Sequence, residues 1–188
     1  MATPTRKNLF KLIEQRVIAG ERKADIYAPY AKLSEAKRVA RVLAQVPTPH
    51  RRAQFKRLNQ LLMMVVALLA LIKALSVLLI VRKAAIADGA LLILLAPVLN
   101  IILIWVIGQF RGVGYTLTVV LGFTALSHIM QGFTQGANGY MLSMNVINLF
   151  GVLSSMVLAF ILLKNLLPYT SFFLSPKKGP SGEPIFED

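Results

Sequence analysis

Long apolar runs, separated by short polar segments, dominate the chain after residue 57. Four of them reach the length of about 20 residues that a membrane-spanning helix needs: 61–81, 90–108, 113–132 and 141–163. Lipid offers no partner to backbone polar groups, so runs of this length are expected to form helices and not open strands. The short connections between them predict antiparallel neighbours. We therefore expect an all-α integral membrane protein whose four transmembrane helices form two antiparallel hairpins.

The first 57 residues follow a different pattern. Between residues 33 and 46, small apolar residues repeat at helical spacing, and Lys37, Arg38 and Arg41 fall on the opposite face. This spacing predicts an amphipathic helix. Residues 6–19 show the same pattern less regularly. Pro49 is well placed to open a long helix that continues into the first span.

These patterns divide the chain into three regions. We expect a basic cytoplasmic helical head over residues 1–57, a four-span transmembrane body over 58–168 and a C-terminal tail over 169–188. The tail is rich in Pro, Gly and Ser, which predicts a flexible segment.

Composition and charge strengthen the membrane interpretation. Only 15% of the 188 residues are charged, and 56% are hydrophobic. Soluble domains carry about 25% charged residues. The net charge is +13, and 14 of the 21 basic residues lie in the first 57 residues, together with four acidic ones. The basic head is thus joined to a body that is almost free of charge.

The placement of Lys and Arg also predicts an orientation. The cluster at 50–57, Arg111 and the lysines after the fourth run all fall on one side of a four-span body. Arg82 and Lys83 fall on the other side and oppose this assignment. The overall bias predicts that both termini are cytoplasmic, in a bacterial plasma (inner) membrane.

Lys73 lies near the middle of the first span, too deep to reach either interface easily. A central lysine costs about 3 kcal/mol on insertion scales. No carboxylate lies inside any of the four spans, and Asn100 lies at a similar depth on the second. Three interpretations stay open for Lys73: an anion or substrate site, a contact with an acidic partner subunit, or a hydrogen-bonded or neutral lysine that serves only the fold.

The third and fourth spans carry further polar and small residues. His128 and Asn148 lie at similar depth on these two spans. A histidine at this position could shuttle protons, or it could form a hydrogen bond between helices. Gly151 and Ser155 belong to a stripe of small residues on the fourth span, and such stripes allow helix backbones to approach closely.

Basic residues next to the first span suggest a membrane-surface partner. Lysines and arginines in this position attract anionic lipid headgroups with about 1 kcal/mol each. We expect such binding at Arg51, Arg52, Lys56 and Arg57. The apolar face of residues 33–46, made mostly of Val and Ala, would suit packing against a cytoplasmic protein or against a neighbouring helix of the chain equally well. Basic charge without a recognition motif does not predict nucleic-acid binding.

The sequence contains no catalytic motif of the familiar kinds. It has no cysteine, no nucleophile elbow, no phosphate-binding glycine loop and no pair of acids inside a span. We expect no enzymatic activity, no cofactor and no metal site. The main hypothesis is an accessory or anchoring subunit of a larger membrane assembly, whose head binds anionic lipid or an acidic partner. The alternative is a small homo-oligomeric transporter or channel that uses Lys73, Asn100 and His128.

Overall fold

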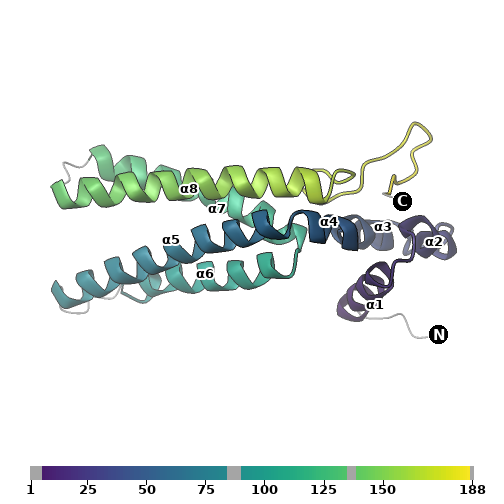
Figure 1. The fold of residues 1–188 in the computed structure, drawn as a ribbon, viewed down its shortest axis with the longest axis horizontal. Coiled ribbons are helices and arrows are strands. Elements are labelled where there is room, and N and C mark those ends of the chain that lie inside the picture. Colours follow the sequence, from purple (N-terminus) through teal and green to yellow (C-terminus); the bar gives the residue numbers. More distant parts are fainter. Residues whose placement is uncertain (1–5, 84–89, 135–138, 187–188) are drawn as a thin grey trace.

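A computed structural model of the chain describes residues 6–83, 90–134 and 139–186 (Figure 1). The described residues form helices and turns, without a strand, which confirms the all-α class. A 3-10 turn covers Ala28–Tyr30. The α-helices are α1 (Arg6–Ile18), α2 (Lys23–Tyr27), α3 (Ala36–Gln45), α4 (Pro49–Gln54), α5 (Lys56–Lys83), α6 (Ala90–Gly108), α7 (Gly112–Thr134) and α8 (Gly139–Leu166).

Three helical segments in the described residues are long and apolar enough to cross a membrane: Lys56–Ser76, Gly112–Thr134 and Leu142–Leu166. This is consistent with an integral membrane protein. A shorter apolar helical segment, Pro97–Gly108 of α6, is found when only the residues with described side chains are considered. The fourth span and the hairpin arrangement therefore stay predictions. The loop over 84–89 lies outside the described residues.

Helices α5 to α8 lie side by side along the long axis of the molecule (Figure 1). Helix α5 packs mainly against α6 and α8, and α7 packs mainly against α8. Their shared apolar core is built from large side chains at the end nearest the head, among them Leu62, Ile107, Tyr115 and Leu162. Lipid is as apolar as leucine, so helices in a bilayer are held together by close packing and polar contacts.

A buried polar link joins three of these helices. The Tyr115 hydroxyl of α7 donates a hydrogen bond to Asn59 Oδ1 of α5 at 2.8 Å. Asn59 Nδ2 in turn donates to the carbonyl of Ile107 in α6 at 3.2 Å. Tyr115 is fully buried and Asn59 is 2% exposed. This link fixes α5, α6 and α7 in register at the head end of the body.

Small residues allow α8 to approach α5. A Cβ atom added to Gly151 would lie only 2.7 Å from Leu69 Cδ2 of α5. Ser155 is buried one turn further along α8, and its hydroxyl donates to the carbonyl of Val152 at 2.8 Å. Both residues of the predicted small-residue stripe thus lie on the packed side of α8.

The head has an apolar core of its own, formed by α1, α2 and α3. Helix α3 begins at Ala36, three residues later than the sequence pattern predicted, and Leu33 is 54% exposed. From Ala36 on, the predicted apolar face is buried: Val39 and Leu43 are fully enclosed. They pack in one cluster with Leu9 and Ile13 of α1.

The junction between head and body differs from the prediction. Pro49 does open a helix, α4, but this helix ends at Gln54. Phe55 has φ −98° and ψ 10°, and α5 begins at Lys56. The single continuous helix predicted from Pro49 into the first span is therefore wrong. Phe55 packs against the body core at this bend.

The tail, predicted to be flexible, returns across the head end of the molecule (Figure 1). Leu174 is 8% exposed and joins the body core. Phe186 packs against the head, where its ring centroid lies 5.2 Å from that of Tyr27. The composition of the tail does not reveal that Leu174 and Phe186 dock it against the body and the head. The head and the tail thus occupy the same end of the molecule.

Candidate functional site

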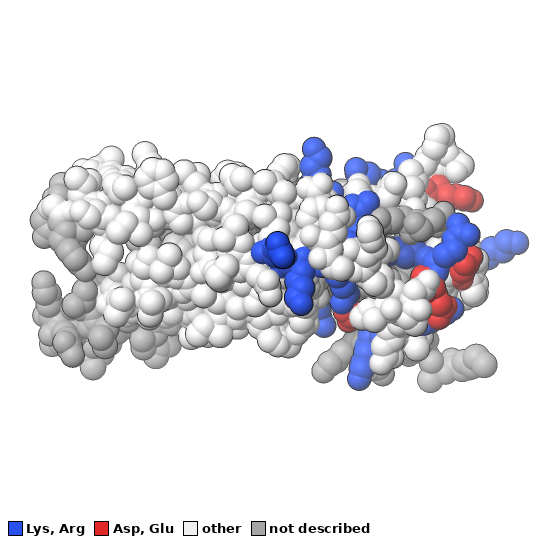
Figure 2. Space-filling model, in the orientation of Figure 1, with Lys and Arg blue, Asp and Glu red and all other residues white. Residues whose placement is uncertain are grey.

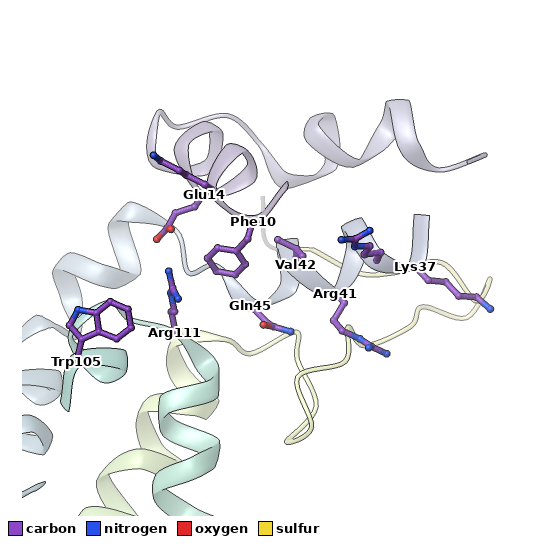
Figure 3. A pocket seen from close by; sticks show the side chains of 10 residues that line it. Phe10, Glu14, Lys37, Arg41, Val42, Gln45, Trp105 and Arg111 are labelled. Atoms are coloured by element: carbon purple, nitrogen blue, oxygen red, sulfur yellow. The ribbon is translucent and has the colours of Figure 1, made fainter. Parts of the chain in front are cut away.

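A groove with a volume of about 980 Å³ lies between the head and the body. Its walls come from three places that are far apart in the chain: α1, α3 and the turn from α6 to α7 (Figure 3). It is far larger than a second cavity of about 10 Å³ that Lys23 and Phe186 help to line. Three elements meeting around an open volume make it the first candidate for a binding site.

Positive charge dominates the groove. Its lining contains one acidic side chain, Glu14, whose carboxylate already accepts a hydrogen bond from Arg52 at 3.0 Å. The basic side chains of the lining are Lys11, Lys37, Arg38, Arg41 and Arg111. Because Glu14 is neutralised by a cation from α4, the groove keeps a large excess of positive charge. It is suited to an anionic ligand.

The local structure explains how these residues are presented. In α3 the buried face is held against the head core, so the basic face is turned outward, and Lys37 and Arg41 extend from it along the groove (Figure 3). On the body side, α6 ends at Gly108 and α7 begins at Gly112. Phe110 closes the turn between them with a left-handed φ of 55°.

Arg111 occupies this turn and reaches toward α1 (Figure 3). Its guanidinium carbon lies 5.0 Å from the ring centroid of Phe10 and 5.9 Å from that of Trp105. Cations within about 6 Å of an aromatic centroid are attracted to the ring face. Arg111 Nε is buried, and it has no hydrogen-bond acceptor among the described residues. The side chain is thus held by two rings while a donor on its edge stays unused.

The groove lies at the boundary between the apolar and the charged parts of the molecule. In Figure 2 the Lys, Arg, Asp and Glu side chains that can be seen gather at the head end, and the described residues of the body show no charge on this face. Trp105 is 62% exposed at the edge of the groove. Tryptophan is enriched at membrane–water interfaces, where its ring is apolar and its N–H group is hydrated.

The four basic residues predicted to bind headgroups divide into two pairs. Arg51 donates to the carbonyl of Asn165 near the end of α8. Arg52 donates to Glu14 of α1 and, at 3.3 Å, to the carbonyl of Pro47. Lys56 and Arg57 are exposed. Arg51 therefore ties the head to the body, and Arg52 ties α4 to α1 within the head, while the side chains of Lys56 and Arg57 are exposed.

The polar residues predicted within the spans lie deeper in the body. Leu69 of α5 lies against Gly151 of α8. On α5, Lys73 lies one turn after Leu69, and on α8, Asn148 lies one turn before Gly151. Because α5 and α8 are packed neighbours, Lys73 and Asn148 fall in the same layer. Lys73 is half-buried, and Asn148 Oδ1 is buried without a hydrogen-bond donor in the described residues.

Asn100 and His128 differ in their surroundings. Asn100 is 8% exposed, and its Nδ2 finds no acceptor within the described residues. Among these residues the structure gives no hydrogen bond between Lys73 and Asn100, the contact predicted from their depth. His128 lies on the exposed face of α7, away from the packed interior. The structure thus separates His128 from the other polar residues of the spans.

Sequence reasoning found part of the groove and missed the rest. It identified Lys37, Arg38 and Arg41 as one basic face, but it did not connect them to Arg111, Trp105 or Phe10. A tryptophan near the end of an apolar run, followed by an arginine in a short turn, was the available signal. Within the described residues, no group of three or more His, Cys, Asp or Glu could hold a metal ion.

No protein-family model, no characterised protein and no solved structure matches this chain at a significant level. The charge of the groove and its position beside the apolar body are the two observations that bear on function most directly.

Proposed function

We propose that the protein is a non-enzymatic multi-pass membrane protein that serves as an accessory or anchoring subunit of a larger membrane assembly. In this proposal the basic head binds anionic lipid headgroups or an acidic cytoplasmic partner. The observation that carries it is the separation of charge from apolar surface along one axis of the molecule (Figure 2). A body that can enter a bilayer ends in a cationic cap at the height of the headgroups.

The proposed topology has four spans in two antiparallel hairpins, with both termini on the cytoplasmic side. The head and the tail lie at the same end of the body, as an even number of spans requires (Figure 1). The described Lys and Arg side chains that are visible in Figure 2 gather at that end, which agrees with the excess of Lys and Arg in cytoplasmic segments.

Electrostatic attraction supplies the proposed membrane affinity. A lysine or arginine near an anionic leaflet contributes about 1 kcal/mol. Lys56, Arg57 and the groove cations give the head several such contributions. The attraction falls off over a Debye length of about 8 Å at physiological ionic strength. The affinity of the head for anionic bilayers should therefore weaken steeply as salt is added.

The half-buried Lys73 supports the accessory-subunit part of the proposal. No carboxylate of this chain lies in its spans to neutralise it. A partner helix with an acidic residue at the same depth would complete the contact, as ionisable residues inside membranes are commonly paired. Asn148 Oδ1, buried and without a donor in the described residues, lies in the same layer.

The experiment that tests the accessory-subunit proposal is an intact-complex mass. The tagged full-length protein would be extracted gently from its native membrane into nanodiscs and weighed as a complex. We expect one additional polypeptide in a fixed stoichiometric ratio, which Lys73→Leu should release. A complex that contains only copies of this chain would contradict the proposal.

A second function keeps support from one observation. Asn100 Nδ2 and Asn148 Oδ1 are buried polar atoms without partners in the described residues, which is costly unless a ligand or water meets them. A small homo-oligomeric transporter or channel using Lys73 and Asn100 would account for them. Lys73→Leu should then abolish anion flux in reconstituted vesicles. An unchanged flux would remove Lys73 from any such pathway.

A further inference from the structure

We propose that the groove between head and body binds one phosphate group, presented by the headgroup of an anionic phospholipid, and that Arg111 is its central ligand. This inference deepens the proposed function and rests on it. A general attraction to anionic bilayers needs only scattered positive charge. The groove has a defined shape and a defined donor, and these point to a single bound headgroup.

The first argument is the state of Arg111. The rings of Phe10 and Trp105 hold its guanidinium at 5.0 and 5.9 Å, and its buried Nε has no acceptor in the described residues. A buried unpaired donor is destabilising, and an arginine stacked on aromatic rings still offers the donors on its edge. Arg111 also lines the groove, where its terminal N–H groups can donate to a phosphate in the bidentate geometry that arginine and phosphate share.

The second argument is the charge around that donor. The one acidic side chain of the lining, Glu14, accepts a hydrogen bond from Arg52. Lys11, Lys37, Arg38 and Arg41 border the same volume. Five cations beside one neutralised carboxylate favour a ligand with negative charge. An apolar ligand would gain nothing from this excess of positive charge.

The third argument is position. Trp105 is exposed at the rim, on the last turns of an apolar helix, and Figure 2 places the change from uncharged to charged surface at this end of the body. A phospholipid seated with its acyl chains beside α6 would carry its phosphate to the level of Arg111. A bound headgroup would also connect α1 and α3 of the head to the α6–α7 turn of the body.

The test uses the full-length protein, purified in a neutral detergent and stripped of lipid. Phosphatidylglycerol, phosphatidylcholine and inorganic phosphate are each titrated, and bound adducts are counted by native mass spectrometry. The variants are Arg111→Gln, Arg111→Lys and Lys164→Gln. The last of these removes one positive charge from an exposed position near the end of α8, outside the groove.

Phosphatidylcholine carries the same phosphate diester, but its choline cation is repelled by the other cations of the groove. We therefore expect one phosphatidylglycerol adduct that is retained at least about tenfold more tightly than phosphatidylcholine. Arg111→Gln should weaken the retention of phosphatidylglycerol by at least about tenfold, because the charge-assisted hydrogen bonds to its phosphate are lost. Arg111→Lys should restore part of this retention, and Lys164→Gln should leave it intact. Saturable binding of inorganic phosphate that is lost in Arg111→Gln would also support the phosphate site, and it would make free phosphate a second source of the ligand.

Two results would overturn the inference. One is equal retention of the two lipids by the wild-type protein, together with no binding of inorganic phosphate. The other is unchanged retention of phosphatidylglycerol by an Arg111→Gln protein that melts like the wild type. If that variant also enriches anionic lipid in bilayers like the wild type, only the groove site fails. If the wild-type protein shows no such enrichment, the proposed function of the head fails as well.

Discussion

Replacing Gly151 with alanine tests the packing of α8 against α5. The added Cβ would lie 2.7 Å from Leu69 Cδ2 and 3.3 Å from Leu69 Cγ. Carbon atoms are at their optimal separation near 3.5–4.0 Å, so the overlap is about 1 Å. Leu69 is 6% exposed and has little room to move. Overpacking of this kind costs about 1–3 kcal/mol, and the better helix propensity of alanine offsets up to about 1 kcal/mol of it.

Gly139 provides the matched control, because it lies in the same helix and nothing stands within 4 Å of an added Cβ. Unfolding in mixed micelles of neutral detergent and SDS, followed by circular dichroism, would give the free energy of unfolding of each variant. We expect Gly151→Ala to be about 1–3 kcal/mol less stable than Gly139→Ala.

A double-mutant cycle with Leu69→Ala isolates the contact between positions 69 and 151. In the background of Leu69→Ala, the obstruction is gone, so the cost of Gly151→Ala should vanish or become a small gain. The coupling between the two positions should be of the order of 1 kcal/mol, because the residues are in contact. Equal stability of the two glycine variants in the wild-type background would refute the close approach of α5 and α8.

Three further changes have defined outcomes. Tyr115→Phe removes the donor to Asn59 and should lower the free energy of unfolding by about 1 kcal/mol, measured in the same unfolding assay. Arg16 donates a hydrogen bond to the Glu21 carboxylate at 2.8 Å, which holds the pKa of Glu21 below its usual range. The stabilisation from this hydrogen bond is therefore present above the unfolded-state pKa of Glu21 and is lost as pH falls through its folded-state pKa. NMR titration should find a higher pKa for Glu21 in Arg16→Gln, and an unchanged pKa would argue against the contact. An added Cβ on Gly112 would lie 2.7 Å from two leucine side chains, one of them in the tail, so Gly112→Ala should speed hydrogen exchange in the tail while that of the head stays unchanged.

The helical class and most helix positions could be read from the sequence, because apolar length and amphipathic spacing are strong local signals. The segments around 61–81, 113–132 and 141–163 correspond to the apolar parts of α5, α7 and α8. The break at Phe55 could not be read, since it depends on where that ring packs in the body. The docking of the tail likewise depends on contacts with distant helices.

The candidate site shows the same limit more clearly. Helical spacing placed Lys37, Arg38 and Arg41 on one face. It gave no information that α1 and the α6–α7 turn lie opposite that face. In the sequence Arg111 was only an orientation signal, because nothing local shows that its guanidinium lies 5.0 Å from the ring of Phe10 and 5.9 Å from that of Trp105. Arg51 and Arg52 were predicted to face lipid, and their acceptors lie instead on segments distant in sequence.

The central claim is that the cationic head holds anionic lipid at the end of the apolar body. Its most direct measurement is the lipid composition around the full-length protein in nanodiscs made from equal amounts of phosphatidylglycerol and phosphatidylcholine. The protein-bound shell would be isolated and quantified at low salt and at high salt. We predict enrichment of phosphatidylglycerol at low salt and its loss at high salt, where charge is screened. A shell with the bulk composition at both salt concentrations would contradict the account.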